Sequence, residues 1–184
     1  MINIKNFSTG MENDSKYKRI IILGGSGSGK STLANRMGLY TGYPIYHMDK
    51  MLHNPDWSRK DKNEWGNICN EFLSKDIGIV DGNYTSIMPN RLNWADLIIF
   101  IDTPTRVKIY RFIRRNIRGS LGLDEHYGIP EGAKERFSVS FILWLYRWDK
   151  NFKTKIFSML ESVKDKKVLI IKEPRELDIV KLLK

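Results

Sequence analysis

Five short apolar segments recur along the chain, separated by stretches in which apolar residues follow a helical spacing. The apolar segments span about residues 19–24, 44–48, 77–81, 96–102 and 167–172, and each is rich in Ile or Val. Such segments are typical of strands buried on both faces of a parallel sheet. We expect a helix after each of the first four strands and another from Glu176 to Leu183. The alternation predicts an α/β fold with helices flanking a parallel sheet.

Three segments depart from this rhythm. Residues 1–17 are polar and are expected to form a mobile leader ahead of a single domain over residues 18–184. Residues 49–76 open with a polar loop, after which we expect Ser58 to cap a helix, with Asp61 three residues further on. Residues 119–135 are rich in Gly and charge. Long loops in a compact α/β domain are usually functional lids, and an ordinary surface excursion is the alternative.

Charge and cysteine content narrow the class of protein. The 184 residues include 31 basic and 21 acidic side chains, a net charge of +10 that suits a polyanionic ligand without choosing between nucleotide, nucleic acid and acidic membrane. The single cysteine, Cys69, excludes an internal disulfide and is expected to pack in the core beside Phe72. Neither a signal peptide nor a run long enough to span a bilayer is visible, so we expect a cytoplasmic protein.

Residues 24–31 carry the clearest motif. They match G-x-x-x-x-G-K-[ST], the P-loop that wraps the phosphates of ATP or GTP. They also follow an apolar strand and open a helix, which presents an anion to the helix N-terminus, and a flexible Gly/Ser linker fits poorly in that place. Lys30 would reach the β- and γ-phosphates, and Ser31 would offer its hydroxyl to Mg²⁺. The predicted nucleotide-binding residues are Gly24, Gly25, Ser26, Gly27, Ser28, Gly29, Lys30, Ser31 and Thr32.

Three aspartates end predicted strands: Asp49, Asp81 and Asp102. In open α/β sheets the ligand crevice lies beyond the carboxyl ends of the strands, so one of them should hold Mg²⁺ with Ser31. Asp102 precedes Thr103 and Pro104, read as a helix N-cap followed by Pro at the first helical position, and it is open between a structural role and nucleotide contact. Asp49 faces the first insert, where it would orient or deprotonate an acceptor hydroxyl, or only position an acceptor that is itself a phosphate.

A basic helix is expected between Thr105 and Arg118. Cations fall on one side and apolar residues on the other, without an acidic residue between Thr103 and Gly119. We favour a phosphate clamp, in which Arg111 and Arg115 neutralise the transferring γ-phosphate, over a solvated face. A nucleic-acid footprint is the rival, and it needs phosphate contacts over a wider surface. The basic side comprises Lys108, Arg111, Arg115 and Arg118, with Arg114 beside it, and the apolar side comprises Val107, Tyr110, Ile113 and Ile117.

Two further sets of residues receive no catalytic role. The aromatic-rich stretch from Phe137 to Ile156 has the spacing of a buried helix, and a base-stacking platform is the less favoured alternative. The histidines His47, His53 and His126 are scattered without a partner spacing, so neither catalysis nor metal binding is assigned to them.

With these motifs in place, the chain resembles the adenylate-kinase-related P-loop kinases, and more narrowly the group named DNA topology modulation proteins. The resemblance runs from about Arg19 to the C-terminus. It is carried by residues 24–32, Met48-Asp49, residues 54–57, residues 81–84 (Asp-Gly-Asn-Tyr), Arg91, residues 100–104 and the arginine helix.

The resemblance implies a P-loop three-layer sandwich with strand order 2-3-1-4-5, an acceptor-binding insert at residues 49–76 and a lid at residues 116–137. It implies that Asp81 ends the strand beside the P-loop strand and so holds Mg²⁺, and that Arg91 binds an acceptor phosphate, with Tyr84 on the acceptor side. Asn83-Tyr84 replaces the Phe-Pro-Arg of adenylate kinases, which argues against adenylate as the acceptor. The lid has no cysteine quartet, so structural zinc is not expected.

The leading hypothesis is therefore an ATP- and Mg²⁺-dependent phosphotransferase whose acceptor is a nucleoside, nucleotide or related metabolite. Lys30, Arg111, Arg115 and Asp49 would act in catalysis, and Asp49, Tyr84 and Arg91 would face the acceptor. Two alternatives stay open: an ATP-binding, nucleic-acid-associated regulator, and phosphorylation of a nucleic-acid end. The sequence names neither the acceptor nor the oligomeric state, and it leaves ATP and GTP undistinguished as donor.

Overall fold

The computed structural model describes residues 15–121, 130, 133 and 138–184, and its strands form one parallel sheet. Neighbouring strands pair in parallel in the order β2-β3-β1-β4-β5. The predicted α/β fold and strand order are confirmed, and every strand lies within one residue of its predicted bounds. The strands are β1 (Arg19–Gly24), β2 (Ile45–His47), β3 (Gly78–Asp81), β4 (Leu97–Ile101) and β5 (Lys167–Ile171).

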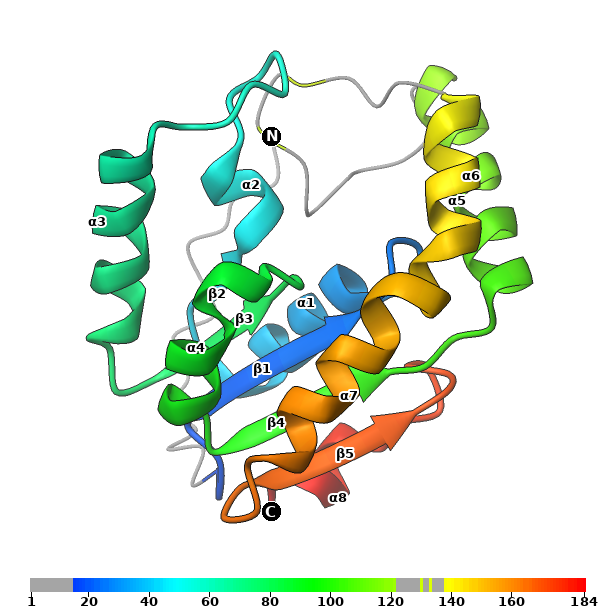
Figure 1. Ribbon diagram of the computed structural model, residues 1–184. Coiled ribbons are helices and arrows are strands. Elements are labelled where there is room, and N and C mark those ends of the chain that lie inside the picture. The colour runs from blue at the N-terminus through cyan, green and yellow to red at the C-terminus, as the bar shows by residue number, and fades with distance from the viewer. Residues whose placement is uncertain (1–14, 122–129, 131–132, 134–137) are drawn as a thin grey trace, which may run out of the picture.

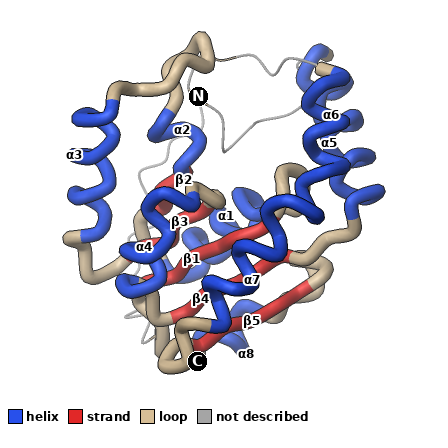
Figure 2. Tube along the Cα trace, in the orientation of Figure 1, coloured by secondary structure: helices blue, strands red, loops and turns tan. Residues whose placement is uncertain are grey.

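Helices cover both faces of the sheet and complete the predicted three layers (Figures 1 and 2). Side chains alternate along β1, so that Ile20 and Ile22 pack on one face while Ile21 and Leu23 pack on the other. The first face is covered by α1 (Lys30–Thr41) and α8 (Ile179–Leu183), and the second by α3 (Lys62–Leu73), α4 (Met88–Trp94) and α7 (Thr154–Glu161). Cys69 is buried in the second core, as predicted.

The remaining elements gather beyond the carboxyl ends of the strands. On one side lie α2 (Met48–Leu52) and the 3₁₀ turn η1 (Thr85–Ile87). On the other, α5 (Thr105–Ser120) and α6 (Val139–Trp148) stand side by side, and α6 continues through the π-helical turn η2 (Asp149–Lys153) into α7 (Figure 1). The two sides face each other across the crevice in which the fold class binds its ligands.

Three predicted helix starts need correction. Ser58 does not cap a helix, because its hydroxyl donates to the Asp56 carboxylate; Asp61 is the N-cap of α3 and accepts from the main-chain N–H groups of Asn63 and Glu64 at 2.8 and 3.0 Å. Pro104, not Thr103, occupies the N-cap of α5, because the Thr103 hydroxyl donates instead to the Lys172 carbonyl at 3.0 Å. The last helix begins at Ile179, because a turn from Glu173 precedes it.

The predicted leader and lid are described only in part. Residues 1–14 lie outside the described residues, whereas the Lys16 N–H donates to the Leu183 carbonyl at 2.9 Å and Tyr17 packs against the first core. Most of the predicted lid, residues 122–129, 131–132 and 134–137, also lies outside the description, and its first residues belong to α5. Among the described residues, none of the helices has the length and apolar character needed to cross a bilayer.

Candidate active site

The P-loop lies between β1 and α1, where the sequence placed it. Gly27 has a left-handed φ of 76°, and a Cβ there would come within 2.6 Å of the Lys108 carbonyl oxygen, so this position requires glycine. The Lys30 ammonium donates to the Gly25 carbonyl at 3.1 Å and therefore lies over its own loop. Burial lowers the pKa of Lys30, and the charges of Asp49 and Asp81 act in the opposite direction.

Asp81 ends β3 directly beside the P-loop strand, with only 3% of its surface exposed. Its Oδ1 lies 3.0 Å from His47 Nδ1. Burial alone would raise the pKa of Asp81, but hydrogen bonds from His47 and Ser31, together with the charge of Lys30, lower it overall. Asp81 is therefore held as an anion.

The Ser31 and Asp81 side chains fit a Mg²⁺ site. A hydroxyl and a carboxylate are the oxygen ligands that Mg²⁺ takes in P-loop proteins, with water in the other positions. The second carboxylate oxygen, Asp81 Oδ2, is buried and has no hydrogen-bond partner among the described residues. A buried anionic oxygen of this kind is costly unless a cation or a donor meets it. Both residues were predicted for this role.

The loop after β3 is held by two sets of hydrogen bonds, one to the P-loop and one to Arg91 of α4. The Asn83 side chain accepts from the Gly24 N–H at 3.0 Å and donates to the Gly24 carbonyl at 2.6 Å. Beneath the loop, Arg91 is fully buried and donates to the Gly82 carbonyl at 2.9 Å. Burial lowers the pKa of Arg91 to about 10, against the charge of Asp81, which raises it. The structure therefore places Arg91 under the loop rather than in the pocket where an acceptor phosphate was expected.

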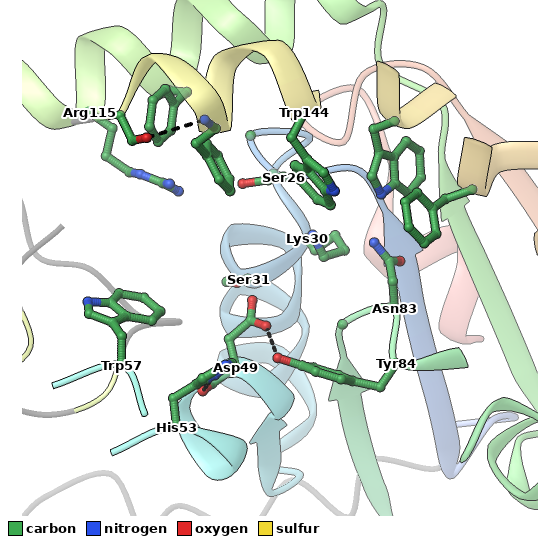
Figure 3. A pocket seen from close by; sticks show the side chains of 18 of the residues that line it. Ser26, Lys30, Ser31, Asp49, His53, Trp57, Asn83, Tyr84, Arg115 and Trp144 are labelled. Carbon is green, nitrogen blue, oxygen red and sulfur yellow. Dashed lines mark hydrogen bonds between the residues drawn. The ribbon is translucent and has the colours of Figure 1, made fainter. Parts of the chain in front are cut away.

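Asp49 and Tyr84 meet on the acceptor side of the site. The Tyr84 hydroxyl donates to Asp49 Oδ1 at 2.5 Å, although the two residues are 35 positions apart (Figure 3). Burial raises the pKa of Tyr84, and the neighbouring Asp49 charge raises it further, so Tyr84 stays protonated and remains a donor. Asp49 itself is exposed. The structure thus brings together two residues that were predicted to face the acceptor.

A strained turn directs a tryptophan toward these two residues. Trp57 has φ 68°, the left-handed region that costs a bulky residue about 1 kcal/mol or more. The turn is held because the Trp57 N–H donates to the Asn54 carbonyl and the Asn54 N–H to the Ser58 carbonyl, both at 2.9 Å. Bridge pairing of His53 with Arg59 flanks it, and the His53 and Trp57 rings lie 5.7 Å apart. Strain in a pocket-lining residue points to function.

The basic side of α5 is turned toward the protein rather than toward solvent. Lys108 is only 1% exposed, and its ammonium lies 4.8 Å from the Trp148 ring centre, against the P-loop. Conversely, Tyr110 and Ile117 of the apolar side are 64% and 58% exposed. Tertiary packing against α6 and the P-loop thus selected the cationic side for burial.

The two arginines predicted to clamp phosphate have different surroundings. Arg111 pairs with Glu173 at 2.5 Å and donates to the Ser28 carbonyl of the P-loop at 3.3 Å. Arg115, one helical turn further on, lines the pocket, and its charge acts on the Lys30 ammonium. Figure 3 shows Arg115 on the wall opposite Asp49. Arg111 therefore braces the P-loop, while Arg115 is the arginine of the pair that reaches the pocket.

Aromatic side chains of α6 and η2, expected to be buried, form part of the pocket wall. Trp148 is 3% exposed and belongs to the core, but Trp144 and Phe152 are 40% and 36% exposed and line the pocket. Along this segment Trp148 packs into the core, whereas Trp144 and Phe152 lie on the side that borders the pocket. Phe137 lies outside the described residues.

One pocket of about 1110 Å³ joins the P-loop with Asp49, Tyr84, Trp57, Arg115 and Trp144 (Figure 3). Typical sites for a single small ligand range from about 300 to 1,000 Å³, so this pocket has room for a nucleotide and a second ligand. Its lining includes the predicted residues Ser26, Gly27, Gly29, Lys30, Ser31, Thr32, Asp49, Tyr84 and Arg115. Sequence reasoning gave no site role to the lining residues His53, Trp57, Arg59, Asn83 and Phe112. It considered the stretch that contains Phe141, Trp144, Trp148 and Phe152 as a base-stacking platform only as the less favoured alternative.

Two of the open questions from the sequence are answered by contacts. Asp102 forms an ion pair with Lys153 of η2 at 2.7 Å, which favours the structural reading of this residue. His47, to which no role was assigned, contacts Asp81, the carboxylate predicted to bind Mg²⁺. Both residues sit at strand ends, but only the fold shows which neighbour each one meets. His126 lies outside the described residues.

No protein-family model and no curated protein matches the chain by sequence. Solved structures do match. Shikimate kinase from Aquifex aeolicus aligns with a TM-score of 0.51 and 16% identity, over 89% of this chain and 93% of that one. A gluconokinase from Sinorhizobium meliloti aligns with a TM-score of 0.49 and 15% identity, over 90% and 86%. The chain has the α/β fold of small P-loop kinases, and at this identity the likeness shows the fold alone.

Proposed function

We propose that the chain is an ATP- and Mg²⁺-dependent phosphotransferase that acts on a small acceptor, namely a nucleoside, a nucleotide or a related metabolite. One observation carries the proposal: Lys30 and Ser31 of the P-loop share a single pocket with the Asp49 carboxylate. A simple NTP-binding switch does not need a carboxylate on the far side of the γ-phosphate position, whereas transfer to a hydroxyl does.

The donor side would be held by the P-loop amides and Lys30, and Arg111 would keep the loop in place through the Ser28 carbonyl. Mg²⁺ bound by Ser31 and Asp81 would supply positive charge at the β- and γ-phosphates. Arg115 would face the moving phosphoryl group and neutralise the charge that develops on its oxygens. Arg91 has no part in this scheme, because its guanidinium is buried beneath residue 82.

On the acceptor side, Tyr84 would hold one oxygen of Asp49, leaving the other to receive the proton of the acceptor hydroxyl. The acceptor oxygen then forms a bond to the γ-phosphorus, and the bond from that phosphorus to the β–γ bridging oxygen breaks. ADP leaves with the electron pair of the broken bond. The proton remains on Asp49 until it passes to water. Atoms and charge balance without a further reactant.

The test is transfer of label from γ-labelled ATP. The purified protein is incubated with labelled ATP and a pool of small hydroxylated metabolites and nucleosides, with Mg²⁺ or with excess EDTA. We expect a labelled small molecule that forms only with Mg²⁺ and does not form with Lys30→Ala. ATP binding without any labelled product from the pool would overturn the proposal.

The net charge of +10 motivates a second candidate, an ATP-binding regulator on nucleic acid. The narrower resemblance to DNA topology modulation proteins, carried by residues 81–84, belongs with it and stays a prediction. Duplex binding that weakens steeply with salt, together with a lack of small-molecule transfer, would favour this candidate. A labelled oligonucleotide end would favour the third hypothesis, end phosphorylation. The first proposal is preferred because cations of α5 face the pocket or the P-loop: Arg115 lines the one and Lys108 lies buried against the other.

A further inference from the structure

Five aromatic rings form a continuous series along one wall of the pocket. Neighbouring ring centres lie 4.8, 5.2, 6.1 and 6.5 Å apart, and two of the four pairs are stacked, with interplanar angles of 30° and 19°. All five rings line the pocket, and they come from α5, α6 and η2. We call this series the aromatic wall; in order of contact it comprises Phe112, Phe141, Trp144, Phe152 and Trp148.

Other parts of the protein cover the aromatic wall only in part. Trp144 is 40% exposed and Phe152 36%, although both belong to the pocket lining. Figure 3 shows the Trp144 ring entering the pocket from above, opposite Asp49, Trp57 and Tyr84. Large rings left open inside a pocket are available to cover the face of a planar ligand.

The opposite wall holds the Asp49 carboxylate and further aromatic rings. Trp57 and His53 form one ring pair, and Tyr84 lies 5.7 Å from Trp65. The P-loop and the Asp49–Tyr84 pair line the same pocket as the aromatic wall, so a ligand that stacks on the aromatic wall can present a hydroxyl to Asp49. A sugar acid or a polyol would instead need several polar partners for its hydroxyls, and stacked rings do not offer them.

The charges of the pocket bear on whether the acceptor already carries a phosphate. Among the described residues, the cations that line the pocket are Lys30, Arg59 and Arg115. The charge of Arg115 acts on Lys30, whereas the charge of Arg59 acts on Tyr84. The Asp49 carboxylate, which accepts from the Tyr84 hydroxyl, would repel an acceptor phosphate. Arg91, the expected ligand of such a phosphate, is fully buried under the loop.

From these contacts we infer that the acceptor is a neutral nucleoside, whose base stacks on the aromatic wall and whose sugar hydroxyl faces Asp49. This inference rests on the proposed function and narrows its acceptor. Base stacking on aromatic side chains tolerates different bases, because every base has a π face. The wall therefore predicts a preference for the class of nucleosides more strongly than for one base.

A three-way comparison of acceptors tests the inference with the full chain. The first set is adenosine, guanosine, cytidine and uridine; the second is their 5′-monophosphates; the third is ribose and gluconate, which have no aromatic ring. We expect at least one nucleoside to exceed its monophosphate, and both ringless acceptors, by about tenfold or more in kcat/KM. The measurement is ATP-dependent product formation followed by phosphorus NMR.

Each outcome of this comparison has a distinct meaning. Transfer to ribose or gluconate but to none of the nucleosides leaves the proposed function standing and overturns the inference. Preferred transfer to monophosphates overturns the inference that the acceptor is uncharged. The protein would then act as a nucleotide kinase. Absence of transfer to every member of the three sets, with ATP bound, overturns the proposed function and the inference together.

Variants on α6 separate stacking from a structural role. Trp144→Leu is expected to raise KM for the preferred nucleoside about tenfold, while Trp144→Phe, which keeps a ring, changes it less than about threefold. Tyr146→Leu is the matched control, because Tyr146 is 70% exposed on the same helix and does not line the pocket. Circular dichroism and thermal unfolding show that each variant is folded. An equal KM for Trp144→Leu and Tyr146→Leu would overturn the stacking role.

Discussion

The donor end of the pocket is built chiefly from main chain, whereas the acceptor end is built from side chains of separate segments. At the donor end, consecutive residues 24–31 form the loop, and the Asn83 side chain forms two hydrogen bonds with the main chain of Gly24, its first residue. At the acceptor end, Asp49 comes from α2, Trp57 from the loop between α2 and α3, and Tyr84 from the loop after β3, while the aromatic wall comes from two helices and a π-helical turn.

From this difference we expect the two ends to tolerate substitution differently. Main-chain amides bind phosphate whatever side chains lie nearby, so a P-loop can serve many reactions. An acceptor site made of side chains can change its ligand by exchange of a few residues, without a change of fold. In this chain, Trp57 with its left-handed φ and Trp144 with its exposed ring are side chains of this kind.

The largest effect is expected at the donor end from Lys30→Ala. The Lys30 ammonium donates to the Gly25 carbonyl, and we propose that it binds the β- and γ-phosphates. Loss of this side chain should therefore lower the rate of transfer by roughly 10³-fold or more with the fold intact. The measurement is kcat/KM for ATP, with circular dichroism as the check on folding. Lys155→Ala, on the exposed side of α7, is the control. Turnover equal to that of the unaltered chain would remove Lys30 from the mechanism.

The next effect tests the acceptor end through Asp49→Asn. An amide cannot receive the acceptor proton, so kcat should fall by about 10²- to 10³-fold while ATP binding is kept. Tyr84→Phe removes only the hydroxyl that holds Asp49 and should cost about tenfold or less. Steady-state kinetics with ATP and the preferred acceptor give both numbers. If Tyr84→Phe proved the more damaging variant, Asp49 would not be the base.

The third prediction distinguishes the roles of Arg111 and Arg115. Arg115→Ala should lower kcat by about 10²-fold, because Arg115 lines the pocket beside the position of the moving phosphate. Arg111→Ala should act mainly on KM for ATP, because Arg111 braces the P-loop through Ser28 and pairs with Glu173. Arg114→Ala, an exposed neighbour on α5, is the control. The reverse pattern would make Arg111 the clamp.

The smallest effect is on stability and concerns Asp81. Its pKa in the folded chain lies below the ordinary value, so the stability it contributes is present above the unfolded pKa of about 3.9 and is lost as pH falls through the folded pKa. Asp81→Asn should therefore lower the free energy of unfolding by about 1 kcal/mol at pH 7, and the difference should shrink in acid.

Urea unfolding at pH 7 and near pH 3 measures this difference. Asp165→Asn is the control, because the Asp165 side chain is 75% exposed. If Asp81→Asn lowered the free energy of unfolding equally at both pH values, the charge of the Asp81 carboxylate would not be what stabilises the nucleotide-free protein.

The sequence by itself determined the sheet and the donor end. Apolar runs of four or more residues specify buried parallel strands, and a P-loop is written in consecutive residues, so local pattern suffices for both. The strand ends also placed Asp49 and Asp81 at the crevice, because parallel strands share one carboxyl edge.

Only the tertiary structure decided which side chains face the pocket. Lys108 and Arg91 look like phosphate ligands in the sequence, but packing buries one against the P-loop and the other beneath Gly82. Trp144 looks like a core residue, but its ring lines the pocket and is 40% exposed. Helical spacing fixes which residues share a face, whereas neighbours distant in the chain fix whether that face is core, loop support or binding site.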